Sequence, residues 1–169
     1  MYYGALEAGG TKMVCAIGDA DKNIIDRISI PTGTPEQSVP AMIDYFKKYD
    51  ISALGIGTFG PADINPNSPT YGSIMRSPKK DWEGFSLYKA FTDALGCLVV
   101  VDTDVNAAAW GEYLYGALKG LNSGMYLTVG TGIGGGIISD GRLIHGMEHP
   151  ETGHILIPRR TGDDIPVSY

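Results

Sequence analysis

The sequence is poor in the features that mark several large classes of protein. Its 169 residues include only two cysteines, Cys15 and Cys97, which lie far apart in apolar segments. That spacing favours buried thiols in a reducing compartment over a disulfide framework. No run reaches the roughly 18 consecutive apolar residues of a membrane span, and no basic residue precedes an apolar run at the N-terminus, as a secretory signal would require. We therefore expect a cytoplasmic protein with no membrane partner.

Positive charge is also scarce. Thirteen Lys and Arg residues stand against 19 Asp and Glu residues, which gives a formal net charge of −6, and no basic cluster is present. Nucleic-acid surfaces need concentrated positive charge, so we expect no nucleic-acid partner. Hydrophobic residues make up 43% of the chain, which is enough for a packed core and too many for a disordered segment.

Glycine, by contrast, is abundant, with 24 residues, about twice the average usage. Many of them fall in two turns between apolar runs, at residues 7–12 (Glu-Ala-Gly-Gly-Thr-Lys) and 128–136 (Thr-Val-Gly-Thr-Gly-Ile-Gly-Gly-Gly). Successive backbone N–H groups in such turns form anion-binding concavities, and the hydroxyls of Thr11 and Thr131 add donors. Hairpin tips also favour glycine, and for the first turn both explanations remain open. In the second turn, five glycines within seven residues favour ligand contact.

The second turn also fits G-x-G-x-x-G, at Gly130, Gly132 and Gly135. This pattern binds dinucleotides when a helix starts at its last glycine. Here a strand-like run with an Asp-Gly turn follows, so we do not expect a dinucleotide-dependent oxidoreductase. Neither turn is a P-loop. Two hairpin turns separated by most of the chain instead suit a cleft that grips one polyphosphate from both sides.

The remaining pattern predicts the order β-β-β-α-β-loop-α-β-α, followed by β-turn-β after residue 124. Thr34–Gln37 is a capping box for the first helix, although Pro40 favours a start at Ser38. The apolar run 97–101 suits a central strand buried on both faces. Residues 62–84 form a loop of a length that is usually functional or disordered. The other expected strands are residues 2–8, 13–18, 24–30 and 53–58, and the later helices begin near residues 86 and 105.

Four segments resemble motifs of the ROK (repressor, open reading frame, kinase) family of sugar kinases. They are residues 7–12, 102–108, 128–136 and 149–154. They occur in the family order, and the first and last are most similar to the fructokinase branch. The resemblance implies an α/β, actin-like (ribonuclease H-like) ATPase fold. Because family members are nearly twice as long, it also implies a complete N-terminal lobe at residues 1–117, with the catalytic aspartate, and an incomplete second lobe at residues 118–169.

The resemblance implies ATP-dependent phosphorylation of a hexose. The similarity to the fructokinase branch makes D-fructose the expected substrate and fructose 6-phosphate the expected product. Asp104 matches the family's general base, which accepts the proton of the sugar hydroxyl. From the residues alone, Asp104 is equally suited to be the N-cap of the helix that follows, and Asp102 is expected to be structural. The implied phosphate- and ATP-binding residues are Gly9, Gly10, Thr11, Lys12, Thr131, Gly132 and Gly134.

The implied sugar-binding residues are Gly60, Thr103, Asp104, Glu151 and His154. Thr103 stands where the family usually has asparagine, and its side chain has a shorter reach. Glu7 replaces the aspartate of many members and is expected to hold Mg²⁺ through water. His154 matches a Zn²⁺ ligand, whose partners in the family lie in a cysteine-rich segment that these 169 residues lack.

Other functions of the same family remain alternatives. A glucokinase or mannokinase differs from a fructokinase by one or two hydroxyl placements in its substrate. A sugar-binding transcriptional regulator carries a helix-turn-helix ahead of the kinase-like region, whereas here the first strand starts at residue 2. The resemblance further implies sugar and ATP as small-molecule partners and a homodimer for the full-length protein. Trp82 is expected to be a loop anchor or a substrate contact, and His145 and His149 to be loop residues.

Overall fold

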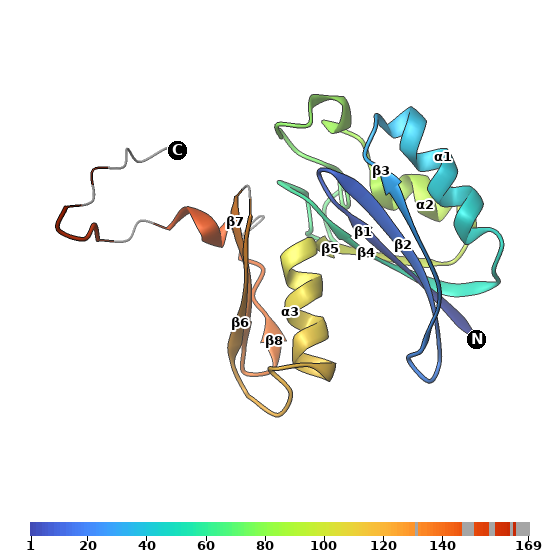
Figure 1. Ribbon diagram of the computed structural model, residues 1–169. Coiled ribbons are helices and arrows are strands. Elements are labelled where there is room, and N and C mark those ends of the chain that lie inside the picture. Colours follow the sequence, from blue (N-terminus) through green and yellow to red (C-terminus); the bar gives the residue numbers. More distant parts are fainter. Residues whose placement is uncertain (131, 147–150, 156–157, 163, 165–169) are drawn as a thin grey trace.

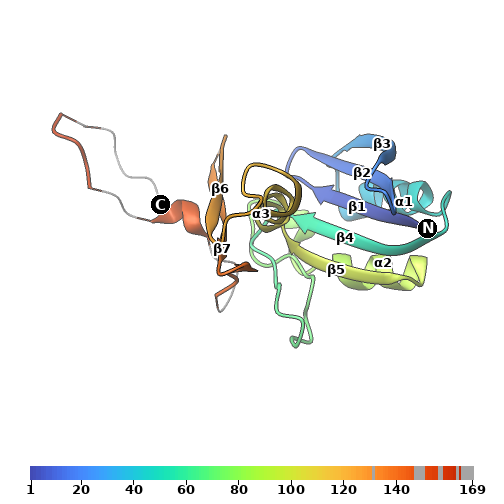
Figure 2. The same cartoon turned by 90° about the horizontal axis from the view of Figure 1, so that it is seen from below.

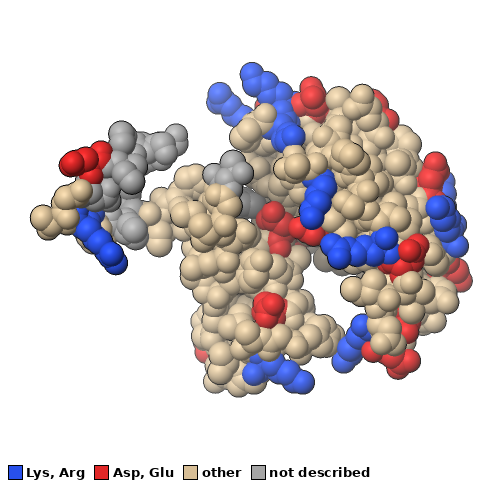
Figure 3. Space-filling view, in the orientation of Figure 1, with Lys and Arg blue, Asp and Glu red and all other residues tan. Residues whose placement is uncertain are grey.

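The computed structural model describes residues 1–130, 132–146, 151–155, 158–162 and 164. Two β-sheets, one of five strands and one of three, lie on either side of helix α3 (Asp104–Tyr115) (Figure 1). Viewed from below, α3 is seen nearly end-on between them (Figure 2). None of the described helices is long and apolar enough to cross a lipid bilayer. On the face shown in Figure 3, Lys and Arg side chains are interspersed with Asp and Glu.

The larger sheet combines an antiparallel meander with parallel strands. Its elements are β1 Tyr2–Ala8, β2 Lys12–Asp19, β3 Ile24–Pro31, α1 Pro35–Phe46, β4 Ile51–Thr58, α2 Leu87–Leu95 and β5 Leu98–Thr103. The strand order is β3-β2-β1-β4-β5, in which β1 runs parallel to β4 and β4 to β5. Parallel neighbours need long connections, and these carry α1 and α2 on one face of the sheet (Figure 1). The predicted order of elements is confirmed, including the second helix between Ser86 and Gly96.

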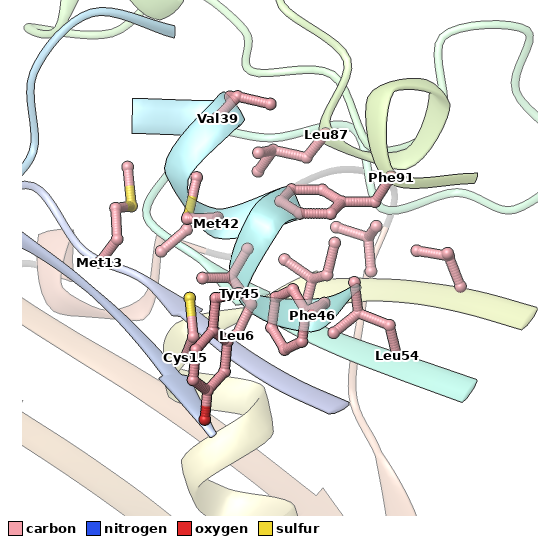
Figure 4. Close-up of a cluster of buried hydrophobic side chains, with 14 of the residues drawn as sticks. Leu6, Met13, Cys15, Val39, Met42, Tyr45, Phe46, Leu54, Leu87 and Phe91 are labelled. Carbon is pink, nitrogen blue, oxygen red and sulfur yellow. The ribbon is translucent and has the colours of Figure 1, made fainter. Parts of the chain in front are cut away.

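The main core lies between this sheet and helices α1 and α2. Met42 and Phe46 of α1 meet Phe91 of α2 above the strands, and all three side chains are fully buried (Figure 4). Each such burial stabilises the fold by about 1.5–3 kcal/mol. Cys15 belongs to the same core, where burial raises the pKa of its thiol to about 12. The prediction of a buried thiol is therefore confirmed for Cys15, whereas Cys97 is only half-buried.

Helix α1 begins earlier than the proline pattern predicted. The Thr34 backbone N–H donates to Gln37 Oε1 at 3.1 Å, and the helix starts at Pro35 rather than at Ser38. The expected shift was wrong because the capping box satisfies the first turn where it stands. Pro40 remains inside the helix, at the cost of one backbone hydrogen bond.

Strand β5 is not the central strand that its apolar sequence predicted. It lies at the end of the described five-stranded sheet, and its side chains alternate between buried and exposed. Val99 and Val101 face the core, whereas Leu98 is 66% exposed and Val100 is 52% exposed. The expectation failed because α1 and α2 cover only one face of the sheet here.

The long loop after β4 is fixed by aromatic side chains. Trp82 is 1% exposed and donates its indole N–H to the Gly33 carbonyl at 2.9 Å. The Tyr71 hydroxyl accepts from the backbone N–H of Val101 at 2.7 Å and lies 2.9 Å from its carbonyl oxygen. Of the two predicted roles for Trp82, the structure therefore shows the loop anchor.

Helix α3 packs directly against the smaller sheet, whose strands are β6 Gly124–Val129, β7 Ile133–Ser139 and β8 Arg142–Leu143. A Cβ at Gly136 in β7 would collide with the Val105 carbonyl and lie 2.8 Å from the Ala109 Cβ. A Cβ at Gly134 would lie 2.9 Å from Val105 Cγ1. Close packing against α3 therefore requires glycine at both positions, a reason that the sequence pattern did not reveal.

Replacing Gly136 with alanine is expected to push α3 away from β7, because the new methyl group has no space beside Val105. Overpacking of this kind lowers the free energy of unfolding by about 1–3 kcal/mol, measurable by urea denaturation. Gly55→Ala is the matched control, since Gly55 is also a strand glycine but a Cβ there meets nothing within 4 Å. Equal losses in the two variants would contradict the packing role of Gly136.

Candidate active site

The carboxyl ends of three neighbouring strands bring the predicted residues together. Glu7 of β1 stands in register with Gly57 of β4, which in turn pairs with Asp102 of β5. The carboxyl ends of parallel strands lie at one edge of a sheet, where ligands bind in many α/β proteins. Helix α3 begins at this edge with Asp104.

A cavity of about 750 Å³ opens beside this edge. Glu7, Asp102 and Asp104 line it from the larger sheet and α3, and Tyr126 and Thr128 line it from β6. The first glycine of the first turn, Gly9, is two residues after Glu7, and the first glycine of the second turn, Gly130, is two residues after Thr128. Both strands that lead into the glycine turns therefore line one cavity, although residues 9–12, 130 and 132 of the turns are not among its lining residues.

Asp104 is the first residue of α3 and not its N-cap. The cap is Thr103, whose hydroxyl accepts the backbone N–H of Asn106 at 3.0 Å. Asp104 Oδ1 accepts the Val105 N–H at 2.8 Å, and the residue is partly exposed to the cavity. The positive end of the helix dipole favours a negative charge at this position. The alternative explanation of Asp104 as a cap is therefore wrong.

Thr103 lies beneath the cavity rather than on its surface. Its side chain is fully buried and its hydroxyl is engaged in the cap. The structure therefore contradicts the expected sugar contact through Thr103, because no surface of the residue reaches the cavity.

The first glycine turn is tight, and hydrogen bonds from Thr32 hold it in place. The Gly9 N–H donates to the Lys12 carbonyl at 3.0 Å, and a Cβ at Gly9 would lie 2.6 Å from that oxygen. Thr32 donates its hydroxyl to the Gly9 carbonyl at 2.7 Å and its N–H to the Thr11 carbonyl at 3.0 Å. Thr11 and Lys12 themselves are exposed. The predicted phosphate residues 9–12 thus form a well-fixed turn at the surface.

Lys79 is a neighbour of this turn that the sequence analysis missed. Its Cε lies 3.9 Å from the position that a Cβ on Gly10 would occupy. The sequence shows only a lysine in a long loop, and the path of that loop depends on Trp82 donating to Gly33. A second cation therefore stands beside the turn through tertiary structure alone.

The second glycine turn is described except for Thr131, which lies outside the described residues. The Gly130 N–H donates to the Gly132 carbonyl at 2.9 Å, and both glycines are exposed with open space around them. Gly134, by contrast, is already in β7 and packs against Val105. Of the predicted phosphate-binding residues in this segment, Gly132 thus lies in the turn, whereas Gly134 lies in β7 and packs against α3.

The segment that carries Glu151 and His154 docks onto β7. Thr152 donates its hydroxyl to the Gly135 carbonyl at 3.2 Å, and a Cβ at Gly153 would collide with the backbone of β7. Glu151 Oε2 lies 3.0 Å from His154 Nδ1, and the His154 side chain is 68% exposed. The two predicted sugar residues are therefore neighbours of each other, held beside the second turn.

The remaining predicted residues do not all meet at the cavity. Gly60 follows β4 and precedes a cis bond to Pro61, and the lining of the 750 Å³ cavity includes neither Gly60 nor Glu151 nor His154. Within the described part of the chain, no group of three or more His, Cys, Asp or Glu side chains is placed to hold a metal ion. Because structural zinc takes about four ligands, the described residues around His154 do not fit a zinc site.

Asp102 makes contacts that the sequence did not reveal, and they join the end of β5 to the start of α3 and to His145. Its Oδ1 accepts the Thr103 N–H at 2.7 Å and the Asn106 side-chain amide at 2.8 Å. Its Oδ2 lies 2.7 Å from Nε2 of His145, and because a carboxylate only accepts, this nitrogen carries the proton. His145 follows β8 in the smaller sheet. It was predicted to be a plain loop residue, and nothing local pairs it with a residue 43 positions away.

Removing the Thr103 hydroxyl is expected to weaken the start of α3. Thr103→Ala should lower the free energy of unfolding by about 0.5–2 kcal/mol, the usual value of an N-cap, in chemical denaturation followed by circular dichroism. Thr103→Ser keeps the hydroxyl and is expected to retain most of that stability. A serine variant as unstable as the alanine variant would show that the cap is not the cause.

Known proteins are similar to this chain in sequence and in fold. The model of the ROK family matches residues 3–164. Fructokinases of Lactococcus lactis subsp. cremoris and Pediococcus pentosaceus are 46% identical over 159 residues and 43% identical over 165 residues. These alignments cover 94% and 98% of this chain but 54% and 57% of the two relatives. The chain thus spans about half the length of the curated relatives it matches.

A solved structure agrees with the sequence comparison. A ROK family glucokinase from Streptomyces griseus, crystallised with glucose and AMPPNP, matches with a TM-score of 0.79 and 32% identity over 94% of this chain and 51% of that chain. The predicted α/β fold of the actin-like ATPases is thereby confirmed. Because the family model matches nearly all of its residues, the chain belongs to the ROK family.

Proposed function

We propose that the full-length protein is an ATP-dependent kinase that phosphorylates D-fructose to fructose 6-phosphate, with Asp104 as general base. The observation that carries this proposal is the placement of Asp104 in the cavity that both strands leading into the glycine turns line. Curated fructokinases that match the chain are 40–46% identical, whereas three matching glucokinases are 29–36% identical. That difference favours fructose over glucose as the substrate.

The proposed role of Asp104 follows from its position. The attacking hydroxyl oxygen of the sugar forms a bond to the γ-phosphorus of ATP, the bond to the β–γ bridging oxygen breaks, and ADP leaves. Asp104 accepts the proton that the hydroxyl loses. Phosphoryl transfer depends mainly on positioning, and Asp104 stands on a helix start fixed by the buried Thr103 cap.

The phosphates are assigned to the two turns. Backbone N–H groups of Gly9, Gly10 and Thr11 and the Lys12 ammonium are proposed to contact them from the larger sheet. Thr131 and Gly132 are proposed to do so from the smaller sheet, while Gly134 contributes by allowing α3 to approach. This assignment rests on the exposure of residues 11, 12 and 132 and on successive N–H groups favouring anions.

Magnesium is assigned to the edge of the cavity near the end of β1. Glu7, Asp102 and Asp104 line the cavity that is proposed to receive a polyphosphate, and carboxylate oxygens with substrate phosphates are the ligands Mg²⁺ prefers. We assign the ion to Glu7, through water. When bound with ATP, the ion neutralises charge that develops on the phosphates.

The sugar is assigned to residues from both proposed lobes. Gly60 of the first lobe, residues 1–117, is proposed to allow close approach of the sugar. Glu151 and His154 of the second lobe, residues 118–169, are proposed to bind its hydroxyls as a pair, because Glu151 Oε2 lies 3.0 Å from His154 Nδ1. A carboxylate and an imidazole together supply both acceptors and a donor for sugar hydroxyls.

A panel of hexoses tests the proposed substrate. ADP release by the full-length protein is measured with fructose, glucose, mannose and galactose in a coupled assay, and kcat/KM is expected to be highest for fructose. A higher value for glucose or mannose would support the glucokinase or mannokinase alternative. Absence of hexose-dependent ADP release with all four sugars would contradict kinase function.

The general base is tested by Asp104→Asn in the full-length protein. The amide keeps the shape of the side chain but does not take the proton, so kcat should fall by about 10²–10⁴-fold, with ATP affinity by calorimetry little changed. Asp21→Asn, at an exposed turn between β2 and β3, is the matched control and should keep its activity. Full activity of the Asp104→Asn protein would sink the assignment.

A further inference from the structure

The carboxylate of Asp102 is fully committed to contacts at the start of α3. Both of its oxygens are engaged, Oδ1 by Thr103 and Asn106 and Oδ2 by His145, at 2.7–2.8 Å. Its side chain is only 22% exposed. Hydrogen bonds to an ionised acceptor are about twice as strong as neutral ones, so these contacts hold the chain firmly where β5 passes into α3.

Asn106 is the buried partner of Asp102 on helix α3. It is fully buried, its Nδ2 donates to Asp102, and its backbone N–H is capped by Thr103. Its Oδ1 is buried without a partner among the described residues, so the amide depends on Asp102 for its side-chain hydrogen bond. Without Asp102 the whole buried amide of Asn106 would lack a hydrogen-bond partner, which costs free energy. Asp102 therefore keeps the Asn106 side chain in place.

His145 extends these contacts to the smaller sheet. It follows β8 and precedes the segment that carries Glu151, and its Nε2–H donates to Asp102 Oδ2. The contact therefore joins the end of β5 in the larger sheet to the chain that leaves the smaller sheet. Asp102 is two residues from Asp104 in sequence, and both line the 750 Å³ cavity, whereas His145 does not.

We propose that Asp102 and His145 are a positioning pair, which holds the α3 start and its Asp104 carboxylate in a fixed relation to the smaller sheet. The proposal rests on the proposed kinase function. Neither residue transfers the proton or the phosphoryl group. Their effect arises because displacing a reacting group by about 1 Å can cost on the order of 100-fold in rate.

The first test is the kinetics of His145→Ala and His145→Gln in the full-length protein. Loss of the donor to Asp102 should lower kcat for fructose by about tenfold, with KM for ATP unchanged. Glutamine places an N–H near the position of Nε2, so His145→Gln should recover most of the loss. Lys89→Ala is the matched control, because it removes an exposed 2.8 Å pair with Asp93, and its kcat should equal that of the unsubstituted protein.

The second test does not depend on activity. Hydrogen exchange of the backbone amides of residues 103–106 should be at least about threefold faster in His145→Ala than in the unsubstituted protein, because local opening at the helix start becomes easier. The amides of the same segment should be unchanged in Lys89→Ala.

The outcomes separate the two proposals. If the unsubstituted protein phosphorylates a hexose and His145→Ala keeps its kcat within twofold, the positioning role is overturned. If no hexose is phosphorylated, the kinase proposal fails, and exchange at residues 103–106 decides alone. Faster exchange then supports the Asp102–His145 pair, and unchanged exchange overturns it.

Discussion

The insertion of one helix between two sheets is the constraint on which the rest of this structure depends. On one side of α3, a Cβ at Gly57 in β4 would lie 2.9 Å from the Ala107 Cβ. On the other side, a Cβ at Gly136 in β7 would collide with the Val105 carbonyl. Glycines in both sheets thus allow the close approach, and the helix between them carries Asp104 at its first residue, beside a cavity that residues of both sheets line.

The start of that helix divides its tasks among residues that are adjacent in sequence. Thr103 is buried and caps the helix, Asp104 faces the cavity, and Asp102 and Asn106 bind each other beneath it. Asp102 and Thr103 end strand β5, where successive side chains point to opposite faces of the sheet, and Asp104 begins the helix. A rigid start is what phosphoryl transfer requires of a general base, since its chemistry depends on position more than on reactivity.

Sequence patterns correctly predicted the features that residues close together in the chain specify. The hairpin of β1 and β2 and the capping box at Thr34 are confirmed, because turns and caps are specified within a few residues. The position of β5 was wrong, since an apolar run does not show which helices cover each face of a strand. The role of Thr103 was wrong for a related reason, because its burial depends on elements far away in sequence.

The sequence by itself determined the order of strands and helices, the two glycine turns and the resemblance to the ROK family. Its motifs are short and contiguous, so their chemistry is visible without a fold. Only the tertiary structure decided that Gly134 and Gly136 serve helix packing, that Lys79 lies beside the first turn, and that His145 reaches Asp102. Each of these depends on contacts between segments separated by tens of residues, and such contacts are set by the packing of the whole chain.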